Sequence, residues 1–146
     1  MKKKETKAIL GALKRVNLSK IEDKELYDKI IKDHLTLIGV QRKYEEDYDD
    51  LYTVFLSAHK ADQERVQELQ EKIRTEADTK KAFEYAQEIN SKDDYQKAVK
   101  AFNAKVETLG NEEVEIDKID MEKFVEEYKK QDYDMGVIEA IYPLFS

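Results

Sequence analysis

The chain has 146 residues and a formal net charge of −7, and 40% of its residues are charged. Only four Gly and one Pro interrupt a sequence rich in Glu, Lys, Leu and Ile, so the composition indicates long helices and excludes a β-sandwich or β-barrel. The absence of Cys excludes disulfides, thiolate zinc sites and cysteine nucleophiles, and the length suits one domain rather than two.

The first predicted helix covers residues 6–16, because Ile9, Leu13 and Val16 recur at helical spacing. Asn17 is expected to end it in the left-handed conformation. The basic start does not lead into an uninterrupted apolar segment, so no signal peptide is expected. No later run reaches the roughly 20 apolar residues of a membrane span, and we therefore expect no membrane partner.

One long helix is predicted over residues 21–73, and the rest of the chain is expected to pack on it or run back along it. Ser19 and Glu22 have the spacing of a capping box, which places the start of the helix here. Up to Val40 the helix is apolar over a wide arc, which indicates several neighbours in a core. From Gln41 onward the arc narrows to one seam, as in a two-helix contact.

Gly39 lies where the arc narrows, and we expect a close approach by another helix there rather than a bend. The chain is expected to turn back within residues 74–79. A break near Ala61 and Asp62 is the alternative position for the turn.

The returning segment is predicted to be helical, with a break at Asn90 and Ser91 and a new cap from Ser91. Its buried face is expected to consist of apolar residues at helical spacing, namely Ala82, Phe83, Ala86, Ile89, Tyr95, Ala98, Val99, Phe102, Val106 and Leu109. Gly110 is expected to end this helix with a positive φ.

Residues 111–120 are predicted to form an extended connector that holds Val114 and Ile116 against the helices, since no second strand is predicted for pairing. Asp120 is expected to cap the next helix. A last short helix is predicted from about Asp134, and the residues after it are expected to enter the core.

The two ends of the chain carry opposite charge. Residues 1–20 contain seven basic residues and one acidic residue, whereas residues 111–146 contain eleven acidic residues and four Lys. This distribution favours contact between the two ends or end-to-end self-association, and a solvated basic tail is the alternative.

The predicted fold is therefore all-α, a long antiparallel helical hairpin with a coiled-coil-like shaft. A short N-terminal helix and a small C-terminal helical lobe are expected to close its base. We expect one elongated domain over residues 1–146, with residues 1–40 and 110–146 in the base and residues 41–109 in the shaft.

No residue pattern predicts catalysis, a cofactor or a metal ion. His34 is interpreted as a structural residue and His59 as solvated, because neither stands in the carboxylate and imidazole spacing of a bundle metal site. Acidic residues gather within residues 45–50 and 112–120, but neither run has the spacing of a calcium loop.

Tyr44, Tyr48 and Tyr52 form an aromatic ridge at helical spacing, continued by Phe55 and His59. The ridge is interpreted first as the buried seam of the hairpin, and second as a protein-binding face with Tyr44, Tyr48 and Tyr52 as its anchors. Nucleic acid is not expected as a partner because the acidic residues beside the ridge repel phosphate.

Self-association along the shafts is also expected, because a two-helix shaft hides at most one stripe per helix. Three apolar residues fall outside the main stripe, and they are Val54, Leu56 and Tyr85. The sequence therefore predicts a homodimer formed along the shafts at micromolar concentration.

Three segments carry a family resemblance: KAILGALKRVNLSKIEDKELYDKII, FNAKVETLGNEEVEID and DYDMGVIEAIYPLF. In their pattern they resemble small phage and prophage proteins of unassigned function from gut bacteria. The resemblance implies a phage-encoded helical protein made in the bacterial host cytoplasm. It implies no catalytic residues, because none are assigned in that family.

The function expected from these observations is that of a non-enzymatic structural or assembly accessory, such as a small virion or tail-assembly component. It is expected to act through contacts with a protein partner or with itself, in the host cytoplasm or in the virion. A phage-encoded inhibitor of a host defence protein is the alternative, and a hydrolase or metal enzyme is less favoured because the sequence offers no polar cleft with a perturbed titratable group.

Overall fold

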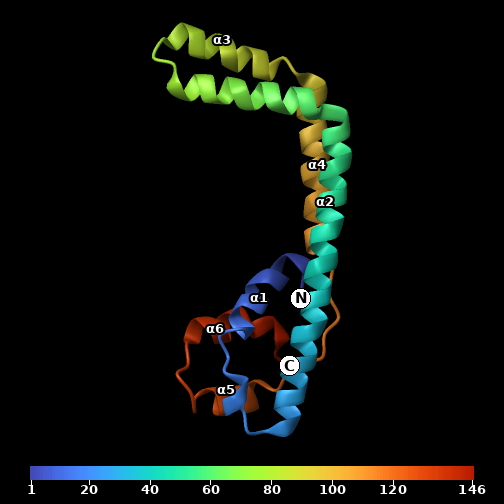
Figure 1. Ribbon diagram of the computed structural model, residues 1–146, viewed down its shortest axis with the longest axis vertical. Coiled ribbons are helices and arrows are strands. Elements are labelled where there is room, and N and C mark those ends of the chain that lie inside the picture. The colour runs from blue at the N-terminus through green and yellow to red at the C-terminus, as the bar shows by residue number, and fades with distance from the viewer. The chain divides into compact units, whose positions relative to one another are not determined.

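The computed structural model describes residues 1–146 and contains helices but no strands, which confirms the all-α prediction. The helices are α1 (Thr6–Leu13), α2 (Lys24–Thr75), α3 (Thr79–Asn90), α4 (Asp93–Asn111), α5 (Met121–Tyr128) and α6 (Met135–Ala140), as Figure 1 shows. Short 3-10 turns lie at Lys3–Glu5, Leu18–Lys20 and Tyr142–Leu144. None of the helices combines the length and the apolar character that a membrane span requires.

The chain divides into two compact units. Unit 1 consists of Met1–Glu46 and Leu109–Ser146, and unit 2 consists of Asp47–Thr108. Helix α2 contributes residues to both units. These limits lie close to those predicted for the base and the shaft, and the description of both as one elongated domain stays a prediction.

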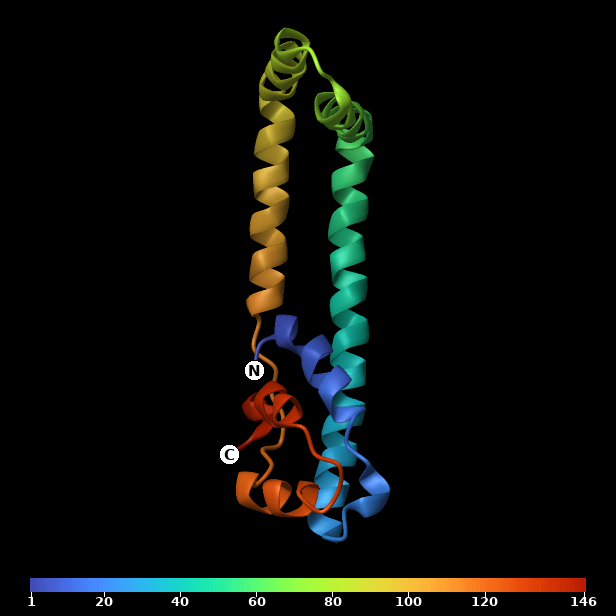
Figure 2. The same ribbon diagram turned by 90° about the vertical axis from the view of Figure 1, so that its left-hand side faces the viewer.

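The core of unit 1 is built from α1, the first half of α2, the connector, α5, α6 and the last residues of the chain. Helix α1 packs against α6 (Figure 2) and ends at Leu13, three residues earlier than predicted. Ile9 and Leu13 of α1 and Val16 just after it are buried, as predicted. The other large side chains in this core are Leu10, Ile21, Leu26, Ile30, Leu37, Ile119, Phe124, Tyr128, Val137, Ile141, Leu144 and Phe145.

Helix α2 begins at Lys24, three residues later than predicted, and its cap is Asp23 rather than Ser19. The Asp23 carboxylate accepts a hydrogen bond from the Leu26 amide at 2.9 Å. The Glu22 amide donates to the Glu127 carboxylate at 2.9 Å, and this contact holds the start of α2 beside α5. The predicted capping box is therefore wrong, because a distant carboxylate takes the amide of Glu22.

Only one face of α2 is buried in unit 1, which corrects the predicted wide arc. Leu26, Ile30 and Leu37 are buried in the core. Leu35 is 65% exposed and Ile38 is 37% exposed, although both belong to the same apolar segment. The neighbouring elements of unit 1 therefore cover one side of this helix and leave an apolar side open.

The connector is extended, as predicted, and it pairs with both ends of the chain. Glu113 forms an isolated antiparallel bridge with Lys2, and Ile119 forms an isolated parallel bridge with Phe145. The Ile119 amide donates to the Leu144 carbonyl at 2.8 Å, and the Ser146 amide donates to the Ile119 carbonyl at 3.0 Å. These bridges fix the chain end against the connector.

The predicted cap at Asp120 is confirmed, and the last helix starts where predicted, with Asp134 as its cap. The Asp120 carboxylate accepts from the Lys123 amide at 3.0 Å, and the Asp134 carboxylate accepts from the Gly136 amide at 2.7 Å. The side chains of Val114 and Ile116 are half-buried and pack against the core, as expected.

The oppositely charged ends contact each other within unit 1. The Lys3 ammonium pairs with Glu112, and the Arg15 guanidinium pairs with Asp134. The N-terminal ammonium of Met1 lies 3.3 Å from the Glu113 carboxylate. The predicted contact between the two ends is therefore confirmed over the solvated-tail alternative.

Three predictions are wrong: that Asn17 and Gly110 end helices with a positive φ, and that another helix approaches Gly39 closely. Asn17 has a φ of −81°, and its side chain caps the 3-10 turn that follows. Gly110 lies inside α4 without a positive φ. An added Cβ at Gly110 would come within 3.1 Å of the Tyr44 hydroxyl, so close packing explains this glycine; Gly39 faces open space and has no close neighbour.

Unit 2 is a helical hairpin in which the second half of α2 runs antiparallel to α3 and α4 (Figures 1 and 2). The turn follows Thr75, within the predicted range. The alternative break is also present in part, because His59 interrupts α2 with a φ of −133°. The returning helical segment of the hairpin is interrupted after Asn90, where α3 ends, as predicted.

Two details of the returning helices differ from prediction. The Ser91 hydroxyl donates back to the Glu88 carbonyl at 2.7 Å, so it closes α3 and does not cap α4. Phe83 is 63% exposed instead of buried, although the other predicted residues of its face on α3, Ala82, Ala86 and Ile89, are half-buried. Val66 and Leu69 of α2 are buried in this part of the hairpin.

The fully buried Leu144 should be essential to the stability of unit 1. Leu144→Ala is expected to lower the free energy of unfolding by about 2–5 kcal/mol, because it removes a large side chain from a packed core. Tyr142→Ala is the matched control, since this neighbouring side chain is 67% exposed, and it should change stability by less than about 0.5 kcal/mol.

Urea unfolding followed by circular dichroism measures the stability of the Leu144→Ala and Tyr142→Ala variants.

Truncation after Met135 removes Val137, Ile141, Leu144 and Phe145 together, and it should abolish the cooperative unfolding transition of unit 1. A truncated chain that melts like the full one would show that the chain end is a detachable tail.

Candidate functional site

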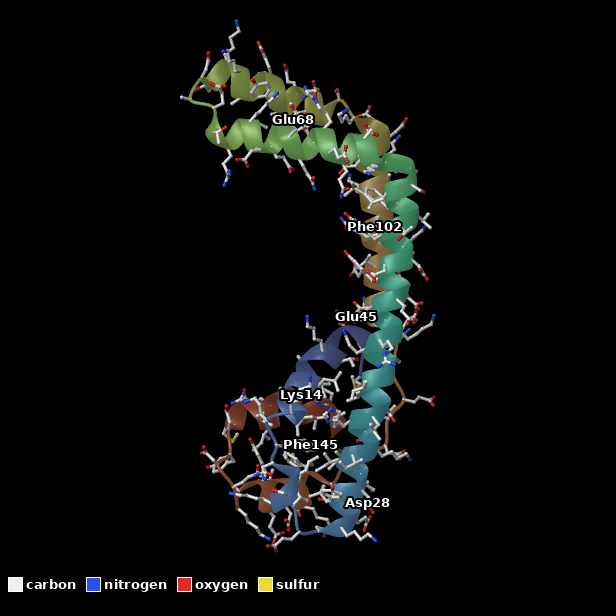
Figure 3. The ribbon with its side chains drawn as sticks, in the orientation of Figure 1. Lys14, Asp28, Glu45, Glu68, Phe102 and Phe145 are labelled. Carbon is white, nitrogen blue, oxygen red and sulfur yellow. The ribbon has the colours of Figure 1, made fainter.

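The aromatic ridge lies in the seam between α2 and α4. The rings of Tyr48 and Tyr52 stack with centroids 6.4 Å apart. The ring of Phe102, which Figure 3 labels on α4, lies against them. Its centroid is 6.0 Å from that of each Tyr ring and 5.2 Å from that of Phe55. Rings at these separations attract each other beyond their burial, so the cluster is a main source of cohesion in unit 2.

The three predicted anchor residues are not equivalent. Tyr44 belongs to unit 1, where its hydroxyl lies beside Gly110. Tyr52 is half-buried, and its hydroxyl accepts from the Gln63 amide at 3.1 Å. Tyr48 keeps 38% of its surface exposed. The structure thus brings Tyr48 and Tyr52 together as part of the seam, and a partner-binding role for the three stays a prediction.

His59 belongs to the same seam, which corrects its interpretation as a solvated residue. Its ring lies 5.4 Å from Phe55 and 6.2 Å from Tyr95, between ring centroids. Its Nδ1 lies 3.9 Å from the Asp62 carboxylate. The same carboxylate also pairs with Lys92 at 3.4 Å, so the breaks in α2 and between α3 and α4 lie at the same level of the hairpin.

Beyond these breaks, α3 is held to α2 by a two-pronged ion pair. Nitrogen atoms of the Arg65 guanidinium donate to the two carboxylate oxygens of Glu88 at 2.8 and 3.0 Å. This pairing lowers the pKa of Glu88 and raises that of Arg65. Such bidentate geometry fixes the register of two helices more firmly than a single contact.

Asp33 on α2, in unit 1, is a carboxyl with a strongly raised pKa. Its side chain is almost fully buried, and its Oδ2 has no hydrogen-bond partner. Burial, and then the negative charge of Asp117, raise the pKa of Asp33 to about 6, while Lys32, Lys29 and Lys118 oppose the shift. A buried carboxyl without a partner is costly when it is ionised.

Asp33 lies at a surface hollow of about 410 Å³ where the connector crosses α2. The lining residues are Lys32, Asp33, Thr36, Glu115, Ile116 and Asp117. The Lys32 ammonium is hydrogen-bonded to Asp117, and this pair lowers the pKa of Asp117. Nowhere in the chain do three or more His, Asp or Glu side chains converge as they would around a metal ion.

Sequence reasoning missed Asp33, although a signal was present. Asp33 lies three residues after Ile30 and four before Leu37, so it shares the face of the helix that carries the core residues. A charged residue at a core position is unusual, and perturbed carboxyls of this kind concentrate at functional sites. In this structure Asp33 has no neighbouring group in an identifiable catalytic role.

The chain was compared with protein-family models, with curated proteins and with solved structures, and it matches none of them. The geometry of the described residues is therefore the guide to function.

Replacing the Asp33 carboxyl should stabilise the protein at neutral pH. The folded-state pKa of about 6 exceeds the unfolded value near 3.9, so the folded chain binds more protons between these pH values. Stability therefore falls as pH rises from about 4 to 6, and the cost is fully present at pH 7. Asp33→Asn is expected to raise the free energy of unfolding at pH 7 by about 1–3 kcal/mol.

Thermal or urea unfolding from pH 3 to 7 measures this effect. The gain in the free energy of unfolding of Asp33→Asn over wild type should disappear below about pH 4, where the wild-type carboxyl is protonated in both the folded and the unfolded state. Asp132→Asn replaces an exposed carboxyl and should show no such pH dependence. An advantage of equal size at every pH would exclude ionisation as its cause.

The seam gives a second prediction with a matched control. Phe102→Ala removes the ring that contacts Tyr48, Tyr52 and Phe55, and it should lower the free energy of unfolding of the hairpin by about 2 kcal/mol or more. Phe83→Ala removes the same side chain from an exposed position and should change stability by less than about 0.5 kcal/mol. Urea unfolding of both variants tests the difference, and equal losses would contradict it.

Proposed function

We propose that this chain is a non-enzymatic phage or prophage protein that acts through protein–protein contacts as a structural or assembly accessory. The phage origin rests on the resemblance of residues 7–31, 102–117 and 132–145 to small phage and prophage proteins. Action through protein contacts rests on a structural observation, the exposed aromatic ring of Phe83.

Helix α3 follows the turn of the hairpin (Figure 1). Phe83 lies in the second turn of α3 and is 63% exposed. Burying a Phe side chain completely is worth about 1.5–3 kcal/mol, so its exposure leaves this free energy available to a partner. Lys80, Lys81 and Glu84 surround it in the sequence, which gives an apolar centre with a charged rim. Aromatic anchors inside polar rims are typical of the residues that dominate protein interfaces.

A second exposed apolar residue supports the same role. Val54, in the α2 part of unit 2, is 67% exposed and lies outside the aromatic seam. The acidic residues within 45–50 disfavour nucleic acid as the partner, because they repel phosphate. A protein partner with a small apolar pocket fits both observations.

The test is affinity capture from bacterial cells that carry the phage or prophage. The wild-type chain is compared with Phe83→Ser and with Tyr142→Ser, which removes an equally exposed aromatic ring from unit 1. We expect wild type and Tyr142→Ser to capture a virion or morphogenesis protein. Phe83→Ser should capture at least tenfold less of it, because a loss of about 1.4 kcal/mol of binding free energy lowers the affinity tenfold.

The identity of the captured protein decides between the candidate functions. A virion or tail-assembly protein supports the proposal, whereas a host defence protein favours the inhibitor alternative. Equal capture by Phe83→Ser and wild type would reject the α3 surface as the contact. Circular dichroism of each variant verifies that the helices remain folded.

A further inference from the structure

One face of α2 in unit 1 is apolar and uncovered. Tyr27, Leu35 and Ile38 are 38%, 65% and 37% exposed, and Ile31 between them is half-buried. Steps of four, four and three residues place these side chains on one stripe of a helix. The stripe is separate from the buried face that carries Leu26, Ile30 and Leu37; we call Tyr27, Ile31, Leu35 and Ile38 the open stripe.

Charged residues of both signs lie at each end of the open stripe. Lys24 and Asp28 lie at the N-terminal end, and Arg42 and Glu45 lie at the C-terminal end; Figure 3 labels Asp28 and Glu45. Lys24, Asp28 and Arg42 form no ion pair within the chain. Glu45 accepts only a neutral hydrogen bond, from the Gln41 amide at 3.0 Å. These four charges remain available for a partner.

We propose that the open stripe binds the same stripe of a second copy of this chain, with the two helices antiparallel and a two-fold axis near Leu35. In this arrangement Ile31 faces the partner's Ile38, and Leu35 meets the partner's Leu35 at the axis. Lys24 faces the partner's Glu45, and Asp28 faces the partner's Arg42. Each charged pair occurs twice because the interface is symmetric.

The charge order selects the antiparallel arrangement over the parallel one. In a parallel pair, Lys24 would lie beside the partner's Lys24, and Glu45 beside the partner's Glu45. Like charges side by side on helices destabilise the contact, whereas opposite charges stabilise it. A surface that complements itself under a two-fold rotation is the signature of an isologous dimer, which is why the partner is a second copy.

The contact is short, so the dimer should be weak. The stripe spans three helical turns, and the apolar side chains at its centre are few. A dissociation constant in the range of about 1–100 µM is expected. The inference does not depend on the proposed function, because Phe83 and Val54 belong to unit 2.

Sedimentation of the full chain from about 1 to 200 µM measures the association. Leu35→Glu places two carboxylates at the two-fold axis and should raise the dissociation constant at least tenfold. Val54→Glu is the control, because it adds the same charge at an equally exposed position of unit 2. Leu35 is exposed, so its replacement should leave the circular dichroism spectrum and the melting temperature unchanged.

A charge exchange tests the register. Lys24→Glu and Glu45→Lys should each weaken the dimer severalfold, and the double variant should restore wild-type association, because each new Lys again faces a Glu. The chain has no Cys, so Leu35→Cys provides a single reactive site. It should form a disulfide-linked dimer under mild oxidation, and Val54→Cys should not.

Several results would overturn the inference. A chain that remains monomeric over the whole concentration range has no such interface. A dimer that survives Leu35→Glu but is lost in Val54→Glu would instead use the hairpin, as predicted from Val54, Leu56 and Tyr85. Failure of the double charge variant to recover would exclude the antiparallel register.

Discussion

The structure of unit 1 depends on how the end of the chain is fixed to the connector. Ile119 and Phe145 form a parallel bridge, and hydrogen bonds on both sides of it tie residues 144–146 to Ile119. With the backbone polar groups satisfied, Leu144 and Phe145 can be buried in a core that also holds α1 and α5. The apolar residues Leu144 and Phe145, next to the last residue, thereby become part of the core against which the helices pack.

The helix content and the order of the elements followed from the sequence, because apolar spacing is a local property. The turn after Thr75, the cap at Asp120 and the start of the last helix near Asp134 were predicted for the same reason. The start of α2 was misplaced because Glu127, distant in sequence, accepts the hydrogen bond of Glu22. Such competition between local and tertiary partners is invisible in a single sequence.

The burial of α2 shows the same limit more clearly. Leu35 and Leu37 are two apolar residues of the same type in one predicted core segment, yet one is 65% exposed and the other is fully buried. Spacing indicates which residues share a face, but only the neighbouring elements decide which face they cover. Asp33 is the converse case, since a carboxyl on the covered face is buried without a partner for its Oδ2.

Buried carboxyls of this kind are retained at a cost. The ionised form of Asp33 opposes folding at neutral pH, and Asp117 in the same hollow adds to that opposition. The connector is nevertheless held there by the pair of Lys32 with Asp117 and by the packing of Ile116. Where the connector crosses α2, Asp117 is therefore attracted by Lys32 and repelled by the ionised form of Asp33.

The interruption of α2 at His59 also has a consequence for how the hairpin tolerates changes in length. An extra residue in an unbroken helix rotates everything beyond it by about 100°, which would move an apolar stripe off its partner. Here the aromatic residues before His59 contact α4, whereas Arg65 beyond it pairs with α3. An insertion or deletion at the interruption would be absorbed where the backbone is already irregular, so a hairpin altered in length there would keep both contacts.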